Sequence, residues 1–506
     1  MTEEQGGEYS HFYGEEPEKT SWLGRKIKRR YVVAMLAFLG FCNIYMLRVN
    51  LSVAVVAMTT NKTHVYPNGT VYEAPDFDWD SKTQGFILAS FFYGYIFTQI
   101  PGGYLATRYG GKRIFLWGVT TTAILTVLTP PLARMHTSLL IGTRIIAGLC
   151  EGVTYPSIHA IWSRWAPPLE QSRITAFAFS GIYMGTVITM PLAGVLAEYI
   201  GWDAIFYVFG CIALIWCVVW WAVVEDSPDQ DRSITDAELE YLRNTIGVTT
   251  KEAGMNPPWG AMFSSKPVWA IIIAHFTENW GFYTLLTSLP MFMRDVLDYS
   301  LDAAGLMAAF PYILMTIVVQ IAGYFADTFR ANGKMTTTHI RKLFTCGAYM
   351  GQSMFMLLTA LVMSRAFSTV FMSLALGLGG LTWAGFGVNH LDVAPNYAAI
   401  LMGISNTVGT IPGILSPAVT GAIVKDRTAD EWRNVFLITS LIYFLGAVMY
   451  GLMASGEKQD WADPQEPLID SEKEKIEDYG TVDDTQYEKE EYYEEEDYYE
   501  EPAEAE

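Results

Sequence analysis

The sequence predicts an all-α membrane protein with twelve transmembrane helices, arranged as two repeats of six. Its 506 residues are 51% hydrophobic and only 17% charged, whereas soluble proteins carry about 25% charged residues. The apolar residues gather in long runs, and a hydrocarbon layer about 30 Å thick needs roughly 20 residues per helix. Because backbone groups in lipid must be satisfied within each segment, we expect these runs to be helices.

The apolar runs and the polar stretches between them divide the chain into five regions. The predicted helices cover residues 32–57, 84–106, 114–133, 138–162, 174–198, 203–224, 268–292, 304–327, 341–363, 367–390, 397–424 and 434–454. The predicted regions are a disordered tail with a basic juxtamembrane end (1–31), a six-helix bundle (32–224), a linker (225–267), a second six-helix bundle (268–454) and an acidic disordered tail (455–506). In the linker, Thr235-Asp-Ala-Glu238 has the pattern of a capping box, which predicts a short helix.

The net charge of −20 is concentrated at the two ends of the chain. Residues 471–506 hold 17 acidic and 3 basic residues, and residues 1–20 hold 6 acidic and 1 basic residue. The body between them is nearly neutral and lacks the clustered basic face of a nucleic-acid-binding protein, so we expect the lipid bilayer as a partner and no nucleic acid. The acidic tail is a solvated segment or a binding site for a cytosolic partner.

Basic residues in short loops indicate how the helices are oriented. Lysine and arginine precede the first helix and follow the second and eighth helices, which places these ends in the cytoplasm. The loop after the first helix carries N-glycosylation motifs at Asn61 and Asn68, which are usable only on the opposite side. We therefore expect a multi-pass protein with both termini cytoplasmic, in the plasma membrane or in a lysosomal or vesicular membrane.

A short internal repeat supports the two-bundle organisation. The sequence GYLATR at 103–108, after the second helix, recurs as GYFADT at 323–328, after the eighth. Transporters use repeats of this kind to build two access states around a site near the midplane of the membrane.

Six charged or histidine side chains lie inside the apolar runs, more than two residues from either end. They are Arg48, Arg144, Glu151, His159, His275 and Glu278. A charged residue in a span costs at least about 2.5–3.5 kcal/mol, so each is a candidate functional residue. The guanidinium of Arg48 offers a planar fork of donors that suits a carboxylate or phosphate, although it could instead bridge to a neighbouring helix.

The other five residues have functional and structural interpretations. Arg144 and Glu151 are two helical turns apart on one face, so they form either a proton-switched pair or a static one. His275 and Glu278 share a face and are proton or anion partners, or packing residues. His159 relays protons or makes a helix-end hydrogen bond. The spacing matches no metal motif, and five cysteines in apolar runs without a CxxC pair predict no disulfide framework.

Several motifs resemble the anion–cation symporters of the major facilitator superfamily, a group that comprises sialin, the vesicular glutamate transporters and the sodium–phosphate cotransporters. The fourth predicted helix carries the long string CEGVTYPSIHAIWSRWAPPLEQSR at 150–173. Shorter matches are LRVNLS (47–52), SFFYG (90–94), QIPGG (99–103), NHLDVAP (389–395) and ISN (404–406).

The resemblance implies a major facilitator fold and a symporter of small anions that works by alternating access. It places the family's first-helix arginine at Arg48, its fourth-helix arginine at Arg144 and its fourth-helix glutamate at Glu151. The seventh-helix histidine of sialin corresponds to His275. Besides Arg48, we expect Arg144 and four polar side chains to contribute to substrate binding, namely Asn50, Tyr93, Asn279 and Asn406.

The sequence also departs from the family pattern. Leu88 and Glu278 stand where vesicular glutamate transporters have a histidine and an arginine, and Ala147 replaces an acid of sialin. The differences at Leu88 and Glu278 favour inorganic phosphate or an organic anion such as sialic acid over glutamate, whereas Ala147 removes the acid pair that would couple transport to protons. We expect sodium or a proton as the co-transported ion and no other cofactor. The alternatives are a vesicular glutamate transporter, an anion channel on the same scaffold, or a scaffold protein acting through its tail. Without a nucleophile–base set or a phosphate-binding loop, we expect no enzyme activity.

Overall fold

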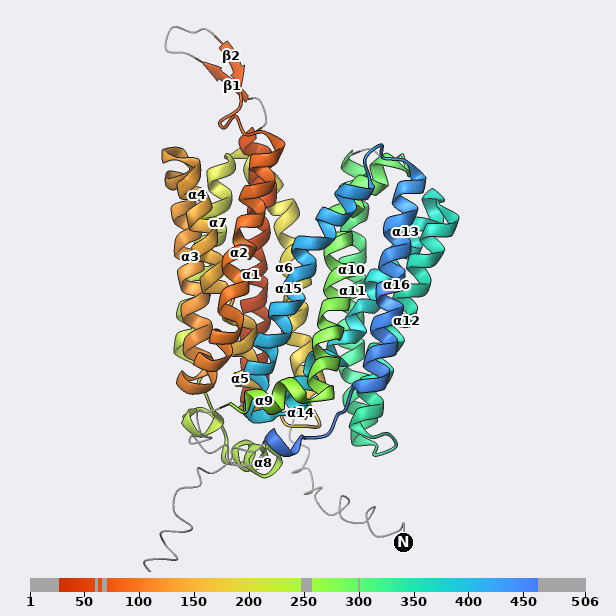
Figure 1. Cartoon of the computed structure of the whole chain (residues 1–506). Helices are drawn as coiled ribbons and strands as arrows, with labels where there is room; N and C mark the ends of the chain where they lie inside the picture. The colour runs from red at the N-terminus through yellow and green to blue at the C-terminus, as the bar shows by residue number, and fades with distance from the viewer. Residues whose placement is uncertain (1–26, 60–61, 66–70, 247–256, 299–300, 463–506) are drawn as a thin grey trace, which may run out of the picture. The chain divides into compact units, whose positions relative to one another are not determined.

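The computed structural model describes residues 27–59, 62–65, 71–246, 257–298 and 301–462, and the account below concerns these residues. The predicted glycosylation sites Asn61 and Asn68 lie outside them, as do most of the N-terminal tail and residues 463–506. Nine helices in the described part are long and apolar enough to cross a membrane, and further helical segments complete the twelve (Figure 1). The predicted all-α fold with twelve membrane-spanning segments is therefore confirmed.

The helices of the first half follow the predicted runs closely. They are α1 (Arg29–Thr59), α2 (Ser81–Tyr109), α3 (Gly111–Met135), α4 (Thr137–Glu151), α5 (Thr154–Trp165), α6 (Gln171–Tyr199) and α7 (Trp202–Val223). Between α1 and α2, the strands β1 (Lys62–Val65) and β2 (Val71–Ala74) pair antiparallel. We call this side of the bundle the hairpin end.

The second half repeats the arrangement. Its helices are α10 (Lys266–Asp295), α11 (Leu301–Ala331), α12 (Thr337–Val362), α13 (Arg365–Leu378), α14 (Phe386–Val393), α15 (Ala398–Ile423) and α16 (Ala429–Met453). The short 3-10 helices η2 (Gly379–Trp383), η3 (Pro395–Tyr397) and η4 (Asp460–Ala462) flank α14 or follow α16. The linker contains η1 (Pro228–Gln230), α8 (Asp236–Ile246) and α9 (Trp259–Ser264), and we call its side of the bundle the linker end.

Two predicted helices are broken. The run predicted as 138–162 is divided into α4 and α5 around Gly152 and Val153, and the run predicted as 367–390 is divided into α13, η2 and α14. Glu151 is the last residue of α4, so the break lies next to a predicted site residue. Discontinuous helices near the midplane typically form the sites of secondary transporters.

The two repeated glycines explain why the halves meet where they do. A Cβ atom on Gly103 of α2 would lie 2.5 Å from the carbonyl oxygen of Ala399 on α15. A Cβ on Gly323 of α11 would lie 2.8 Å from Cα of Arg173 on α6. Both contacts join the two halves, so the sequence repeat marks two equivalent places where helices pack backbone to backbone.

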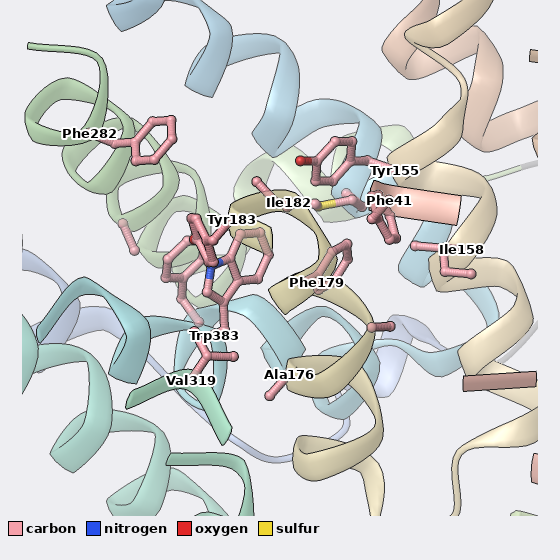
Figure 2. Packing of buried hydrophobic residues seen from close by; sticks show 14 of the residues in the cluster. Phe41, Tyr155, Ile158, Ala176, Phe179, Ile182, Tyr183, Phe282, Val319 and Trp383 are labelled. Atoms are coloured by element: carbon pink, nitrogen blue, oxygen red, sulfur yellow. The ribbon is translucent and has the colours of Figure 1, made fainter. Parts of the chain in front are cut away.

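Aromatic rings fill the interface between the halves, on the side of these glycine contacts that faces away from the linker end. The rings of Phe179 (α6) and Trp383 (η2) lie with centroids 4.4 Å apart, and Trp383 Nε1 donates to the Tyr183 hydroxyl at 2.6 Å (Figure 2). Large interdigitated rings of this kind bury much apolar surface and pack at specific angles.

The structure corrects the boundaries of both predicted tails. Arg29 and Arg30 already belong to α1, and Arg30 forms ion pairs with Glu170 at 2.8 Å and Glu238 at 3.0 Å. Half of the capping box predicted for α8 forms, because Glu238 N donates to Thr235 Oγ1 at 3.4 Å, whereas the carboxylate of Glu238 binds the start of α1. At the other end, residues 455–462 pack on the bundle, with Gln459 N donating to Val393 O at 3.0 Å.

Candidate functional site

A small cavity lies between the two halves. Its volume is about 30 Å³, and it is lined by Tyr45, Arg48, Tyr95, Tyr155, Ile182, Tyr183, His275, Glu278, Asn279, Phe282, Tyr283, Trp383 and Asn406. One ordered water needs roughly 10–15 Å³ of such volume, so this conformation has room for about two waters. The site is therefore contracted around its own side chains.

The positive side of the cavity is the guanidinium of Arg48. Its Nε donates to Glu151 Oε1 at 2.8 Å, and its Nη2 forms an ion pair with the same oxygen. Aromatic rings surround the guanidinium at centroid distances of 4.9, 4.9 and 4.7 Å, those of Tyr45, Phe91 and Tyr95. The second oxygen, Glu151 Oε2, has no hydrogen-bond partner among the described residues.

This pairing corrects the predicted one. Arg144 was expected to pair with Glu151, but it forms no ion pair with a described residue, and its Nε has no hydrogen-bond partner. The guanidinium instead lies over the ring of Phe91, 5.1 Å from its centroid. Arg144 and Arg48 thus both contact the ring of Phe91. Glu151 pairs with Arg48 of α1 and not with Arg144 of its own helix, α4.

Helix α10 contributes five cavity residues, of which His275, Glu278 and Asn279 were predicted from the sequence. His275 Nδ1 is hydrogen-bonded to Ser405 Oγ at 3.1 Å, and Asn279 Nδ2 donates to Gly409 O at 2.7 Å. A Cβ on Gly409 would lie 2.8 Å from the His275 ring, so glycine is needed there. Glu278 is only 4% exposed, and neither carboxylate oxygen has a described hydrogen-bond partner.

Of the four predicted polar binding residues, Asn279 and Asn406 line the cavity and the other two do not. Asn406 Nδ2 donates to Tyr95 Oη and to Gln99 Oε1 at 3.0 Å each, which joins α15 to α2. Tyr93 is 40% exposed and contacts Phe86, so the structure corrects its predicted place. Asn50 is also away from the cavity: it is buried in α1, and its amide has no described partner.

His159 lies on α5 inside the interface between the halves. Its Nε2 is 3.1 Å from Gly387 O of α14, and its Nδ1 is 3.2 Å from Tyr155 O of its own helix. It therefore makes both a helix hydrogen bond and a contact across the halves. Sequence reasoning missed its neighbour His390, which stands at the last residue of a predicted span, and it missed Tyr95, whose uncharged side chain gave no signal.

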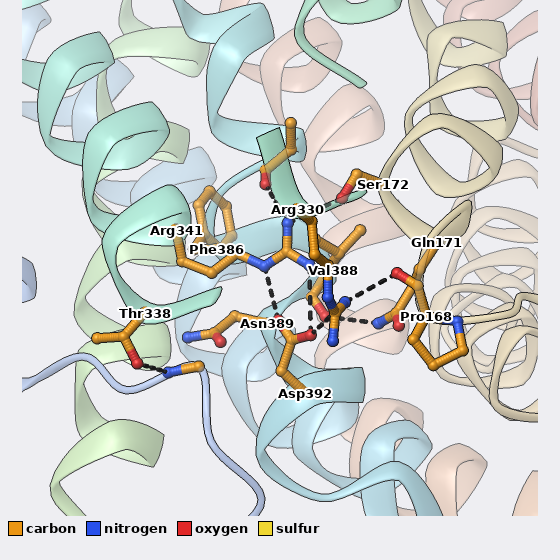
Figure 3. Close-up of polar contacts among 12 residues, drawn as sticks. Pro168, Gln171, Ser172, Arg330, Thr338, Arg341, Phe386, Val388, Asn389 and Asp392 are labelled. Atoms are coloured by element: carbon orange, nitrogen blue, oxygen red, sulfur yellow. Dashed lines mark hydrogen bonds and ion pairs between the residues drawn. The ribbon is translucent and has the colours of Figure 1, made fainter. Parts of the chain in front are cut away.

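Polar contacts close the linker end of the interface (Figure 3). Arg341 Nε donates to Asp392 at 2.6 Å within the second half, and Arg341 Nη1 donates to Ser172 Oγ of the first half at 2.8 Å. The carboxylate of Asp327 accepts from the backbone N–H groups of Ser172 at 3.0 Å and Arg173 at 2.8 Å. Asp327 thus binds the first turn of α6, where the helix dipole favours a negative charge.

Comparisons with known proteins agree with this arrangement. Residues 33–417 match the profile of the Major Facilitator Superfamily. Vesicular glutamate transporter 1 of Xenopus laevis is 45% identical over 446 residues, which cover 87% of this chain and 77% of the relative. Vesicular glutamate transporter 2 of Homo sapiens is 44% identical over 444 residues, which cover 87% and 76%.

Two solved structures share the fold at low sequence identity. The fucose:proton symporter of E. coli superposes with a TM-score of 0.60 and 10% identity over 83% of this chain and 99% of that one. A proton:xylose symporter bound to 6-bromo-6-deoxy-D-glucose gives a TM-score of 0.65 and 15% identity over 85% and 97%. With its family profile and its relatives, the chain belongs to the major facilitator superfamily and, within it, to the anion–cation symporter group that includes the vesicular glutamate transporters.

Proposed function

We propose that this transporter carries small organic anions by alternating access, with proton coupling, and that glutamate is the first anion to test. The observation that carries the proposal is the buried ion pair of Arg48 with Glu151 beside a cavity that both halves line. The relatives named above support glutamate more than the sialic acid or phosphate that Leu88 and Glu278 favoured in the sequence.

The Arg48–Glu151 ion pair would allow a substrate carboxylate to replace the carboxylate of Glu151 on the guanidinium. When Glu151 accepts a proton, its carboxylate becomes a neutral acid and its charge attraction to Arg48 ends. A substrate carboxylate can then take its place on the guanidinium, whose fork of donors binds carboxylates in bidentate fashion. A removed partner would leave a buried charge uncompensated, which costs about 3–5 kcal/mol. Proton binding and anion binding are thereby linked at one site.

Glu278 shapes which anion fits. It places a carboxyl group on the cavity wall, and neither of its oxygens has a hydrogen-bond partner among the described residues. A doubly charged phosphate would be repelled there unless Glu278 is protonated, whereas the ammonium group of glutamate would complement it. We therefore propose that Arg48 holds a carboxylate, with Asn279 and Asn406 as further hydrogen-bonding groups, and that Glu278 and His275 respond to protons.

The names of the relatives suggest in which cellular membrane this protein lies. The chain is a multi-pass membrane protein, and the relatives are named as vesicular transporters. We propose an acidic vesicular membrane, with the linker end and both termini in the cytoplasm, as the basic loops predict.

Uptake into proteoliposomes tests the proposal. Purified protein would be offered labelled glutamate, sialic acid or phosphate, with pH gradient, sodium gradient and membrane potential imposed separately. We expect saturable glutamate uptake that needs the pH gradient or the potential but not sodium. Sodium-driven phosphate uptake, or anion currents that need no driving cation, would overturn it.

Replacing the arginine tests the proposed anion contact. Arg48→Ala should abolish uptake, and Arg48→Lys should retain little, because an ammonium lacks the bidentate fork. The double variant Arg48→Ala/Glu151→Ala removes both charges and should restore thermal stability but not uptake. Full uptake by Arg48→Ala would exclude this residue as the anion site.

A further inference from the structure

Three histidines and one serine form a continuous buried row, and of these four residues the proposed substrate site uses only His275. The row runs from His275 on α10 through Ser405 on α15 to His390 on α14, with His159 of α5 beside His390. All four side chains are buried, with exposed fractions of 3% for His275 and 0% for the others. Four helices from both halves therefore converge on one titratable cluster.

The row has a defined beginning and end. At its beginning, His275 lines the cavity. At its end, His390 lies on the short helix α14 at the linker end (Figure 1), and its Nδ1 is buried without a described hydrogen-bond partner. The rings of His390 and His159 meet edge to face with centroids 5.1 Å apart.

The serine hydroxyl lies between two imidazole nitrogens. Ser405 Oγ is 3.1 Å from His275 Nδ1 and 2.9 Å from His390 Nε2, with the Met402 carbonyl at 3.2 Å as a competing acceptor. A hydroxyl has one hydrogen to donate and can accept through its lone pairs. When both bonds form, one ring nitrogen must therefore donate to Ser405 and the other must accept from it.

We propose that His275, Ser405 and His390 form a proton relay between the central cavity and the interface at the linker end. This inference rests on the proposed proton-coupled transport and names a route for the proton. The relay starts with His275 protonated on both nitrogens. Its Nδ1 proton passes to Ser405 Oγ while the hydroxyl proton of Ser405 passes to His390 Nε2. His275 is then neutral, Ser405 again holds one proton, and His390 carries the positive charge.

The proton leaves from the far side of His390. Release from Nδ1 returns His390 to neutrality with its remaining proton on Nε2, and His275 also keeps its proton on Nε2. The row resets when both rings return to the Nδ1–H tautomer, by ring rotation or proton exchange with water, and the Ser405 hydroxyl turns back toward His390. The charged groups around the row are Arg48 and Glu278 at the cavity and the Arg341–Asp392 pair near α14. The other titratable groups are His159 on α5 and the cavity tyrosines Tyr45, Tyr95, Tyr155, Tyr183 and Tyr283. No carboxylate hydrogen-bonds any of the three rings in the described structure, so a protonated ring has no fixed counterion and the charge is free to move on.

The end of the relay is linked to the closure of the linker end. The hydrogen bond from His159 to Gly387 O crosses between the halves beside His390. Opening of this end would separate α5 from α14 and expose His390 Nδ1 to water. The proton would then be released on the side to which the substrate is released, as coupling requires.

Ser405→Ala tests the relay without changing any charge. Glutamate exchange needs no net proton movement, whereas accumulation driven by a pH gradient does. We expect the variant to keep exchange and to lose pH-driven accumulation by roughly 100-fold, the lower range for removal of a positioned proton-transfer group. Ser405→Thr keeps the hydroxyl and should retain accumulation. Ser416→Ala, which removes another buried hydroxyl of α15, is the matched control.

The outcomes separate the relay from the proposed function. Wild-type protein that exchanges no anion would refute the transport proposal itself. Wild-type transport that ignores the pH gradient, or normal accumulation by Ser405→Ala, would overturn the relay and leave transport standing. Loss of both exchange and accumulation in Ser405→Ala and Ser405→Thr would assign Ser405 to packing or substrate binding, and would also overturn the relay.

Discussion

At the scale of single residues, the carboxylate of Glu151 determines which of the two arginines near the site is paired. Glu151 ends α4 at the break, where it reaches across to Arg48 on α1 and leaves Arg144 on its own helix with only a ring contact. Arg144 therefore remains a second cation near the site, without an ion pair to a described carboxylate. We predict that it supports the negative charge of a bound substrate at longer range than Arg48 does.

Two tyrosines on α2 provide a matched pair of substitutions. Tyr95→Phe removes the hydroxyl that accepts from Asn406 and should lower uptake several-fold, because the lost hydrogen bond is worth about 0.5–1.5 kcal/mol. Tyr93→Phe removes a hydroxyl from a ring outside the cavity and should leave uptake unchanged. Initial rates of glutamate uptake, normalised to protein in the vesicles, measure both. Equal losses in the two variants would contradict the placement of the cavity.

At the scale of helices, the close approach of α2 to α15 keeps the linker end shut. Gly103→Ala places a methyl group against Ala399 O, so the helices must separate, and we expect more molecules open at this end. Gly142→Ala on α4 meets no atom within 4 Å and should change stability by at most about 1 kcal/mol. Spin labels on exposed linker-end residues of each half would report the distance distribution. An unchanged distribution in Gly103→Ala would argue against this contact as the closing element.

The ion pairs around Glu170 fasten the start of α1 to the loop before α6. Burial alone would raise the pKa of Glu170, but the hydrogen bond and charge of Arg30 lower that pKa from 4.5 to about 2. Because the folded-state pKa is depressed, the interaction stabilises fully above pH 4.5 and is lost as the pH falls toward 2. Glu170 therefore stays charged throughout the pH range of an acidic vesicle.

Glu170→Gln should accordingly lower the melting temperature without reshaping the pH profile of transport. The expected destabilisation is about 1.5–3 kcal/mol, the value of a hydrogen bond to a charged group. Thermal unfolding in detergent and uptake measured between pH 5 and pH 7 report the two quantities. A shifted pH optimum in this variant would mean that Glu170 takes part in coupling.

At the scale of the whole molecule, the end of the second bundle is fastened to the linker end by residues beyond its last helix. Gly456 N donates to Thr338 Oγ1 at 2.8 Å, and Ala462 is fully buried. Removal of residues 463–506 should leave uptake and melting temperature unchanged, because the acidic composition of this segment predicts a solvated tail outside the bundles. Removal of residues 455–506 should lower the melting temperature. If the shorter truncation abolished uptake, the acidic tail would have a direct role and the scaffold alternative would gain support.

Hydropathy and charge determined the architecture because both are local properties of the chain. Twelve apolar runs, a polar linker and a repeated glycine sequence predicted the two bundles, and the cost of charge in lipid selected Arg48, His275 and Glu278 as site residues. His390 escaped that selection because it stands at the edge of a predicted span, where a charge costs little.

Only the tertiary structure decided the partners of these side chains. Glu151 meets Arg48 across 103 residues of sequence, and Ser405 lies between His275 and His390 because three separate helices present those faces to one another. Periodicity shows which residues share a face of one helix, but the rotation of each helix against its neighbours depends on the packing of the whole interface. Tyr95 turns inward and Tyr93 outward for the same reason.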